Sequence, residues 1–446
     1  MRMGWIALSL AVVGCSTVTD RPFESLPWQS SAPSPVDPQP QVDVSDGLDV
    51  EEAVVLALEN NPRFQGARLG IDFARARKVI AETYPYNPEF GMETSRALPF
   101  SAKGDYSVQL SLSQTLETGG KRGHRIAAAE ADIERSAAAL VDDRRLLRAQ
   151  VVAQFYELLF LEQRQGVGTQ NLALAQRLLE VAEARFVAKQ IPEIDVNLVR
   201  LDHGRANIEK EQISQDAQVA RANLAALIGQ PDRLDFQLEG EMSALAVIPD
   251  RERLHRAAEE HRPDLRAARA QVRTTEERVR LARALAIPDV TVGLTAGRER
   301  SAIDSPEGAL SDVDKIVGIS VSVPLPLINT RRGERLEAEV ERRRALADVE
   351  TIAQEIRRDV GRAVTRLETG RTLVESYERD LNRLAQQSLD DMLRAYKVGE
   401  VGTLQVLRAQ EDLNRVKAAH AEAQFAFRSA LADLEAALGT PLSEVK

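Results

Sequence analysis

The sequence predicts a mainly α-helical protein with a smaller β part, in which one structural half occurs twice. Residues 225–231 read Ala-Ala-Leu-Ile-Gly-Gln-Pro, and residues 435–441 read Glu-Ala-Ala-Leu-Gly-Thr-Pro. Two long segments without proline have helical periodicity, and four shorter segments alternate between apolar and polar residues. The period is far longer than a solenoid unit, so it indicates a duplicated half.

Composition narrows the class of protein. The chain has 446 residues, of which 28% are charged and only 4% aromatic, as is typical of long helices. A net charge of -10 argues against nucleic acid as a partner, because phosphate binding requires a basic surface. The mean hydropathy of -0.28, with no mature apolar run of about 18 residues, excludes a helical inner-membrane protein.

The N-terminus predicts export. Residues 1–14 read as a signal peptide, and Val12-Val13-Gly14-Cys15 resembles a bacterial lipobox, in which cleavage exposes a cysteine for acylation. Cys15 is the only cysteine, so no disulfide forms within the chain, and we expect Cys15 to carry lipid. The alternative is an ordinary signal peptide that contains a cysteine by chance. Residues 15–45 are rich in proline and serine and predict an extended tether.

The rest of the chain is expected to form two structural repeats, residues 46–240 and 241–446. Each repeat is predicted to contain a helix, two strands, a long helix, a tip and a returning helix.

Helical periodicity locates the long elements. Residues 49–82 are predicted to be helical with a break at Pro62, and residues 121–189 and 331–398 predict matching helices. At 1.5 Å per residue each long helix would extend roughly 100 Å. The returning helices are expected to end at Gly229 and Gly439. These helices alone are equally compatible with a soluble coiled coil.

The alternating segments favour a membrane β-barrel. Residues 106–113 place Tyr, Val and two Leu on one face and small or polar residues on the other, and residues 317–323 repeat the pattern. Residues 89–95 and 289–297 are the weaker partner strands, and residues 97–105 and 298–315 are predicted loops. Such alternation is typical of strands with lipid on one side and water on the other, although a half-buried soluble sheet shares it.

Four strands cannot close a barrel. An open sheet edge in lipid leaves backbone groups unpaired, so the chain is expected to use strands from its own copies. Three copies give twelve strands around a water-filled lumen, whereas a dimer gives eight strands around packed side chains. We therefore predict a homotrimer whose twelve-stranded β-barrel continues into an α-barrel of long antiparallel helices.

Residues 116–131, together with Leu58-Glu59-Asn60-Asn61-Pro62 and the two tips, resemble the TolC-like outer-membrane efflux family. The resemblance covers roughly residues 46–440 and is greatest to the heavy-metal cation branch of the cobalt, zinc and cadmium type. It implies a passive trimeric duct, with a β-barrel in outer-membrane lipid and an α-barrel across the periplasm. It also implies two partners, a periplasmic membrane-fusion adaptor and an inner-membrane pump of the resistance-nodulation-division type. The alternative is a lipid-anchored periplasmic coiled-coil adaptor or structural protein without a barrel.

The same resemblance assigns roles to the helical tips. We expect the adaptor to contact two hairpins, formed by Lys189, Gln190, Ile191 and Pro192 and by Gly399, Glu400, Val401, Gly402 and Thr403. Asp195 matches an acidic position of the family's periplasmic gate, whereas Gln405 and Arg408 replace aspartates of the family. This departure suggests that Asp195 pairs with Arg408. The alternative is that these residues are only exposed charges at helix ends.

Other charged residues suggest no catalytic chemistry. Lys121, Arg122, Arg331 and Arg332 are expected near lipid headgroups, where long basic side chains snorkel. Residues 119–122 lack the spacing and the Ser or Thr of a phosphate loop. His255, Glu259 and His261 lack a further ligand at compatible spacing, so a solvated helix face is favoured over a metal site. We expect no cofactor, no metal and no enzyme activity, and the exported substrate is expected to be selected by the pump.

Overall fold

The computed structural model of the chain describes residues 47–96, 105–242, 247–305 and 308–445, and of residues 302–305 and 308–311 it describes the backbone alone. The predicted signal peptide, Cys15 and the tether lie outside this part. Within the described residues, none of the helices combines the length and apolar character that a membrane crossing requires.

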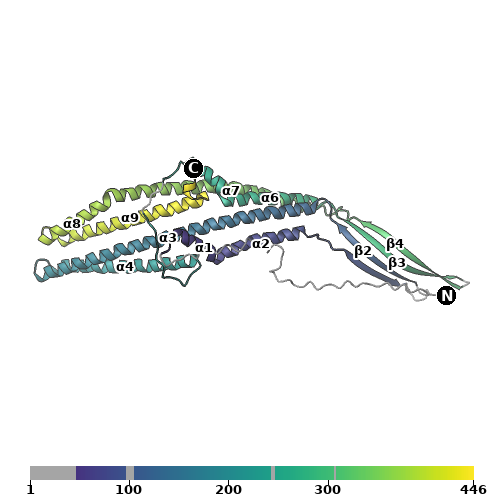
Figure 1. Cartoon of the computed structure of the whole chain (residues 1–446), viewed down its shortest axis with the longest axis horizontal. Helices are drawn as coiled ribbons and strands as arrows, with labels where there is room; N and C mark the ends of the chain where they lie inside the picture. Colours follow the sequence, from purple (N-terminus) through teal and green to yellow (C-terminus); the bar gives the residue numbers. More distant parts are fainter. Residues whose placement is uncertain (1–46, 97–104, 243–246, 306–307, 446) are drawn as a thin grey trace. The chain divides into compact units, whose positions relative to one another are not determined.

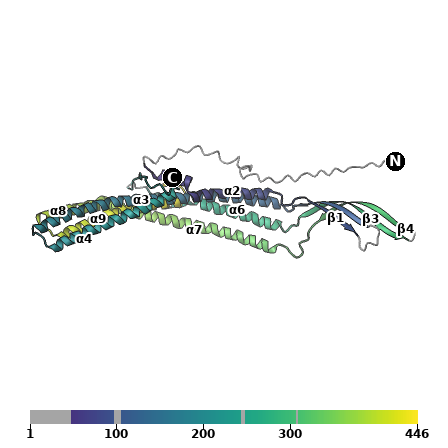
Figure 2. The same ribbon diagram turned by 90° about the horizontal axis from the view of Figure 1, so that it is seen from below.

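The helices confirm the predicted duplication. The first half contains α1 (Val50–Asn60), α2 (Pro62–Glu82), α3 (Lys121–Val187) and α4 (Glu193–Leu227). The second half contains α5 (Arg251–His261), α6 (Pro263–Ala284), α7 (Arg332–Ser376), α8 (Asn382–Val398) and α9 (Thr403–Leu438), followed by the 3-10 turn η4 (Leu442–Glu444). Helix α2 packs on α3, α3 on α6, and α6 on α7 (Figure 2). The helices of the two halves therefore lie side by side, and α3 packs directly against α6.

The break predicted at Pro62 is present, and Asn61 organises it. Asn61 ends α1, and its Oδ1 accepts hydrogen bonds from the N–H groups of Arg63 (3.0 Å) and Phe64 (3.3 Å) at the start of α2. Its Nδ2 donates to the carbonyl oxygen of Leu227 at the end of α4, at 2.9 Å. One side chain therefore caps the N-terminus of one helix and the C-terminus of another.

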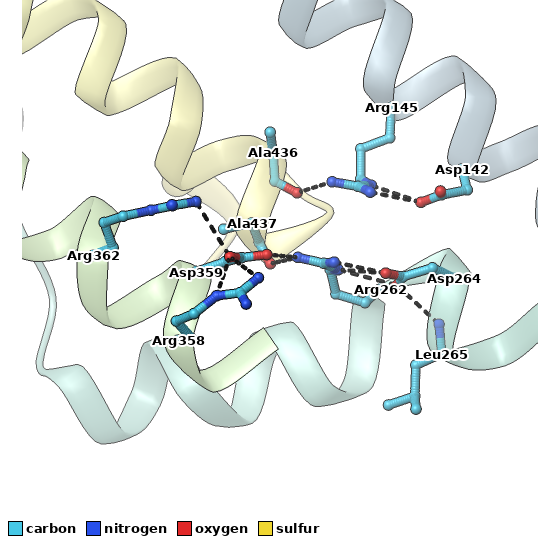
Figure 3. A network of polar contacts seen from close by, with 10 residues as sticks. All are labelled: Asp142, Arg145, Arg262, Asp264, Leu265, Arg358, Asp359, Arg362, Ala436 and Ala437. Atoms are coloured by element: carbon cyan, nitrogen blue, oxygen red, sulfur yellow. Dashed lines mark hydrogen bonds and ion pairs between the residues drawn. The ribbon is translucent and has the colours of Figure 1, made fainter. Parts of the chain in front are cut away.

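Arg262 takes the place of Asn61 in the second half, and a charged network replaces the amide (Figure 3). Its guanidinium donates to the carbonyl oxygen of Ala437 (3.3 Å) and pairs with Asp264 (2.6 Å) and Asp359 (3.7 Å). Burial lowers the pKa of Arg262, but the two carboxylates outweigh burial and raise it overall. Arg145 of α3 also donates to the end of α9, so the network joins both halves.

Glycines end the returning helices as predicted. Gly229 and Gly439 have φ of 75° and 78°, a left-handed conformation that favours glycine. A Cβ at Gly229 would lie 2.5 Å from the carbonyl oxygen of Asn60, and one at Gly439 would lie 3.1 Å from that of His261. Each helix end therefore packs directly on the backbone beside a helix junction.

The strands form one antiparallel sheet in the order β1-β2-β3-β4, and Figure 1 labels β2, β3 and β4. The strands are β1 (Glu89–Arg96), β2 (Tyr106–Leu116), β3 (Val290–Ser305) and β4 (Gly308–Ser322). In the register, Met92 pairs with Leu110, Leu110 with Ala296, and Leu294 with Ile319. The apolar residues therefore share one face, and Ser111, Ser113, Ser320 and Ser322 share the other.

The loop predicted over residues 298–315 is wrong. Strands β3 and β4 continue through most of it, with Arg298 opposite Lys315 and Glu299 opposite Asp314. The prediction treated polar residues as loop residues, but the hydrogen bonds of a ladder connect backbone groups and require no apolar side chains. The second hairpin is therefore longer than the first.

The helix predicted over residues 331–398 is also interrupted. A five-residue π segment, η3 (Tyr377–Leu381), lies between α7 and α8. Beside it the Asn382 amide contacts Nδ1 of His420 at 3.1 Å, and the His420 ring lies 6.1 Å from that of Tyr377. A π turn contains one residue more than an α turn, and the spacing of apolar residues in the sequence did not predict it here.

Candidate functional site

Two helical hairpins, α3 with α4 and α8 with α9, place the predicted tips together. The N–H groups of Lys189 and Gln190 donate to Phe186 and Arg185 at 2.8 Å each, which closes the first turn. Lys189 has a φ of 57°, and Gly399 holds the matching position of the second turn with a φ of 83°. A left-handed conformation costs a residue other than glycine roughly 1–2 kcal/mol, so the first tip contains local strain.

An apolar cluster joins the two hairpins. Its buried members come from all four helices and are Leu178, Ala182, Val199, Tyr396 and Val406. Ile191 of the first tip and Val401 of the second tip pack against this cluster and are partly buried. The tips of one protomer are therefore held together mainly by burial of apolar side chains.

Arg185 adds a specific contact between the hairpins. Its Nη1–H donates to the carbonyl oxygen of Tyr396 at 2.9 Å, and its guanidinium carbon lies 4.6 Å from the centroid of the Tyr396 ring. Arg185 Nε–H also donates to Oε1 of Gln190, at 3.3 Å. The Tyr396 hydroxyl lies 3.4 Å from Oγ1 of Thr403, which is buried at the start of α9. Arg185 thus contacts both tips.

Sequence reasoning missed Arg185 and Tyr396 as site residues. The repeat aligns Phe186 with Tyr396, and the structure separates the two: Phe186 is exposed, whereas Tyr396 is fully buried under Arg185. The hydroxyl and the contact with Arg185 distinguish the second position from the first. In the sequence, the change from Phe186 to Tyr396 at matching positions is the feature that distinguishes the second tip from the first.

The predicted gate residues are not brought together within one protomer. Asp195 is partly exposed in the first turn of α4, where its N–H donates to the carbonyl oxygen of Pro192 at 3.1 Å. Gln405 and Arg408 are exposed on α9. In the described part of the chain no ion pair joins Asp195 to Arg408. The hairpins meet through their apolar faces, so the predicted pairing is wrong inside the protomer.

A polar layer crosses the same hairpins farther from the tips. Buried Gln410 of α9 donates from Nε2 to Asn171 of α3 (3.1 Å) and to Asp202 of α4 (3.2 Å), and Asn414 also donates to Asn171. Burial raises the pKa of the Asp202 carboxyl, and the hydrogen bond from Gln410 only partly opposes this rise. The layer therefore contains a carboxylate whose charge is disfavoured.

Lys121 does not snorkel in this structure. Its ammonium lies 2.6 Å from Asp289, and the two side chains are only 4% and 14% exposed. The same carboxylate accepts from the Thr118 N–H and the Tyr86 hydroxyl, both at 2.9 Å. Burial raises the pKa of Asp289, but the hydrogen bonds, that from Lys121 foremost, lower it overall. The pair joins the start of α3 to the start of β3, where the sheet meets the helices.

The other three predicted interface residues differ from Lys121. Arg122 donates to the carbonyl oxygen of Glu82, the last residue of α2, at 3.0 and 3.2 Å. Arg331 pairs with Glu334 at 2.9 Å, and Arg332 is exposed. Their placement at a membrane interface stays a prediction.

The histidine-containing helix α5 is a surface helix. Glu259 pairs with Arg357 at 3.1 Å, and His261 contacts the carbonyl oxygen of Ala257 through Nδ1 at 2.9 Å. Over the residues that the structure describes, no group of three or more His, Cys, Asp or Glu side chains is arranged to hold a metal ion.

Comparison with known proteins gives matches across most of the chain. The model of a family described as outer membrane efflux protein matches residues 53–230 and again residues 254–440. The cobalt-zinc-cadmium resistance protein CzcC of Cupriavidus metallidurans is 26% identical over 366 residues, which cover 82% of this chain and 84% of CzcC. The probable outer membrane lipoprotein SilC of Salmonella typhimurium is 25% identical over 381 residues, which cover 80% of this chain and 78% of SilC.

A solved structure shares the fold. The crystal structure of CusC, described in terms of folding and transmembrane channel formation, matches with a TM-score of 0.72 at 17% identity. The match covers 88% of this chain and 93% of CusC.

Proposed function

The chain belongs to the outer membrane efflux protein family, and from this premise we propose that three copies form the outer-membrane duct of a tripartite efflux system for heavy-metal cations. The duct is passive, and an inner-membrane pump of the resistance-nodulation-division type delivers the substrate through a periplasmic membrane-fusion adaptor. The observation that carries the proposal is the four-stranded sheet whose apolar residues gather on one face, joined to helical hairpins that end in packed tips.

The exposed edges of the protomer support a trimer. Among the described residues, β1 and β4 each have one edge without a partner strand, and an unpaired edge in lipid costs several kcal/mol for each backbone group. The helices show the same asymmetry. Phe73 on α2 is 61% exposed. Thr274, at the matching position of α6, is only 1% exposed, because α6 packs between α3 and α7 of the same chain. A neighbouring copy would cover the edges that the chain leaves open.

The tips support the gate and the adaptor contact. The two hairpins meet through the apolar cluster and Arg185, so closure of the duct depends on their relative position. Val187, Ile194, Val398 and Leu404 are exposed around the tips and offer apolar area to an adaptor. Asp195, Gln405 and Arg408 remain gate candidates as contacts between protomers.

The proposed substrate and the proposed lipid anchor are based on the names of two relatives. The name of the Cupriavidus relative states cobalt-zinc-cadmium resistance, so we assign heavy-metal cations as the exported substrate. The Salmonella relative is described as a probable outer membrane lipoprotein, which supports acylation at Cys15 of the lipobox-like segment. Outer-membrane lipid would then hold the chain both through its barrel and through the anchor.

The coiled-coil adaptor remains the alternative, and the four strands with a lipid-type face speak against it. Purified protein in planar bilayers tests the duct: we expect trimers by native mass spectrometry and a steady ionic conductance. A monomer without conductance would reject the duct. Deletion of the gene tests the substrate, because tolerance of cobalt, zinc and cadmium should fall; unchanged tolerance with intact conductance would reject the metals but retain the duct.

A further inference from the structure

We propose that Glu89 of one protomer pairs with Arg332 of the next, and that this pair is the intermolecular copy of the Lys121–Asp289 pair. The inference rests on the trimer of the proposed function and names the residues that join its subunits. It follows from the internal duplication. Within one chain, the second half packs beside the first half, and a trimer repeats this contact between the second half of one copy and the first half of the next.

The two halves match closely where the sheet meets the helices. Pro88-Glu89 corresponds to Pro288-Asp289 at the start of the first strand of each half. Lys121 is the first residue of α3 and Arg332 the first residue of α7. Both helices follow a residue in the left-handed conformation.

That conformation is unusual in the second half. The residue before α3 is Gly120, with a φ of 72°, but the residue before α7 is Arg331, with a φ of 51°. Backbone strain at a residue other than glycine persists only where surrounding structure maintains it, and it gathers at functional positions. The strained Arg331 places Arg332 at the helix start as Gly120 places Lys121.

The strand register supports the same equivalence. When the first hairpin is moved onto the second by these correspondences, the pair Met92 and Leu110 falls on Val292 and Val321. Val292 and Val321 are indeed partners in the second hairpin. The offset derived from the helix start therefore agrees with an independent hydrogen-bonding register.

The exposure of the four charged residues differs between the two halves, as expected if Glu89 and Arg332 are paired only in the trimer. Lys121 and Asp289 are largely buried against each other. Glu89 and Arg332 are exposed, and neither side chain has a partner among the residues that the structure describes. They lie at the two outer edges of the protomer, on β1 and at the start of α7, so only another copy can bring them together.

The equivalence also predicts the register between subunits. The pair Ser111 and Thr295, between β2 and β3, becomes Ser322 with Ser95 of the next protomer. The pair Leu116 and Val290 becomes Leu327 with Phe90 of the next protomer. Leu327 and Phe90 are 82% and 72% exposed in the single chain, so the register would give each an apolar neighbour.

Cross-linking of cysteine pairs tests the contact in the full-length protein. The variant Glu89→Cys with Arg332→Cys, treated with a short bismaleimide, should give covalent trimers on a denaturing gel. The variant Lys121→Cys with Asp289→Cys should link within one chain and leave the apparent mass unchanged. Glu93→Cys with Arg332→Cys is the matched control, because Glu93 lies on the same face of β1 but two pleat periods, or four residues, farther along. Each single variant controls for reaction with Cys15.

Charge reversal provides a second test that does not depend on cross-linker reach. Glu89→Arg or Arg332→Glu should each speed dissociation of the trimer in detergent about tenfold, and the combination should return the rate to within about twofold of the wild type. Glu93→Arg should have little effect. Trimers that form normally but show neither the cross-link nor the recovery would overturn the pair and leave the proposed duct standing. Absence of trimers from the wild type would overturn both.

Discussion

Arg185 in the first hairpin and Tyr396 in the second are joined by a hydrogen bond of 2.9 Å to the Tyr396 carbonyl and by a cation–π contact of 4.6 Å. The contact lies among the residues of the apolar cluster at the tips. Because it connects the two hairpins of one protomer, it opposes their separation. The predicted Asp195–Arg408 pair is absent within the protomer, and Arg185 with Tyr396 provides the link between hairpins instead.

Arg185→Ala should loosen the tips. Loss of the hydrogen bond and the cation–π contact should weaken the association of the hairpins by about 1–2 kcal/mol. In planar bilayers the variant should show more frequent or larger open states without adaptor. Tyr396→Phe retains the ring and the carbonyl, so it should behave like the wild type. Arg200→Ala removes a pair with Glu183 inside the first hairpin and is the control; an equal effect of Arg200→Ala would refute a specific role for Arg185.

Asp202→Asn should stabilise the helical hairpins near neutral pH. The pKa of Asp202 is raised in the folded state, so the folded protein binds more protons than the unfolded chain between the ordinary Asp pKa, about 3.9, and the folded value. The free energy of unfolding therefore falls as pH rises through this window. The amide of the variant still accepts from Gln410, and the gain at pH 7 should be no more than about 1 kcal/mol.

Thermal unfolding followed by circular dichroism at pH 7 and pH 3.5 measures this effect. The difference between Asp202→Asn and the wild type should shrink at the lower pH, where the wild-type carboxyl becomes neutral. Asp412→Asn is the matched control, because Asp412 occupies the equivalent position in the second half and is exposed. A difference that grows on acidification would contradict the assignment.

Lys121→Met should destabilise the junction of sheet and helices by roughly 3 kcal/mol, because it leaves Asp289 without its cation in a largely buried site. The double variant Lys121→Met with Asp289→Leu should lose less than the sum of the single variants. The pKa of Asp289 is lowered overall, so its contribution is present above the ordinary Asp pKa and is lost as pH falls through the folded value. Detergent-resistant trimers on heated gels report the loss, and strictly additive effects would argue against the pair.

Leu110→Arg should impair insertion into the outer membrane, whereas Ser111→Arg should not. Leu110 lies on the apolar face of the sheet with Leu294 and Ile319, and Ser111 lies on the other face. An arginine facing lipid near the midplane costs roughly 2–4 kcal/mol, and one facing a water-filled lumen does not. Fractionation of outer membranes measures the inserted amount. Equal insertion of both variants would refute the proposed orientation of the sheet.

Cys15→Ser should release the N-terminus from lipid without removing the protein from the outer membrane, because the proposed barrel inserts by itself. Mass spectrometry of the wild-type N-terminus should show cleavage after Gly14 and an acylated Cys15. An unmodified cysteine, or cleavage at another bond, would reject the anchor.

The sequence predicts the fold well where one pattern dominates. The proline break at position 62 and the stops at Gly229 and Gly439 depend on neighbours along the chain, and they are confirmed. The ends of β3 and β4 are missed because backbone pairing continues through polar residues. Local patterns therefore identify the elements but do not fix how far a ladder extends.

The site is less predictable because its contacts join distant segments. Arg185 meets Tyr396 only after two hairpins have packed, and Lys121 meets Asp289 only after α3 has reached the start of β3. A basic residue beside a predicted strand is equally consistent with a lipid headgroup and with a buried carboxylate. The distinction depends on what the other half of the chain brings to it, which spacing does not reveal.

The π segment at Tyr377–Leu381 sets the angular phase of the second tip. Each residue of an α-helix turns the chain by about 100°, and a residue in a π turn turns it by less, because the π turn contains more residues. Tyr396 follows this segment on α8 and packs in the cluster that joins the two hairpins. If the same five residues formed a regular α-helix, the aromatic ring of Tyr396 would be turned away from Arg185. The irregular turn thus sets the direction in which α8 presents Tyr396, and a more regular helix would present this side chain on another face.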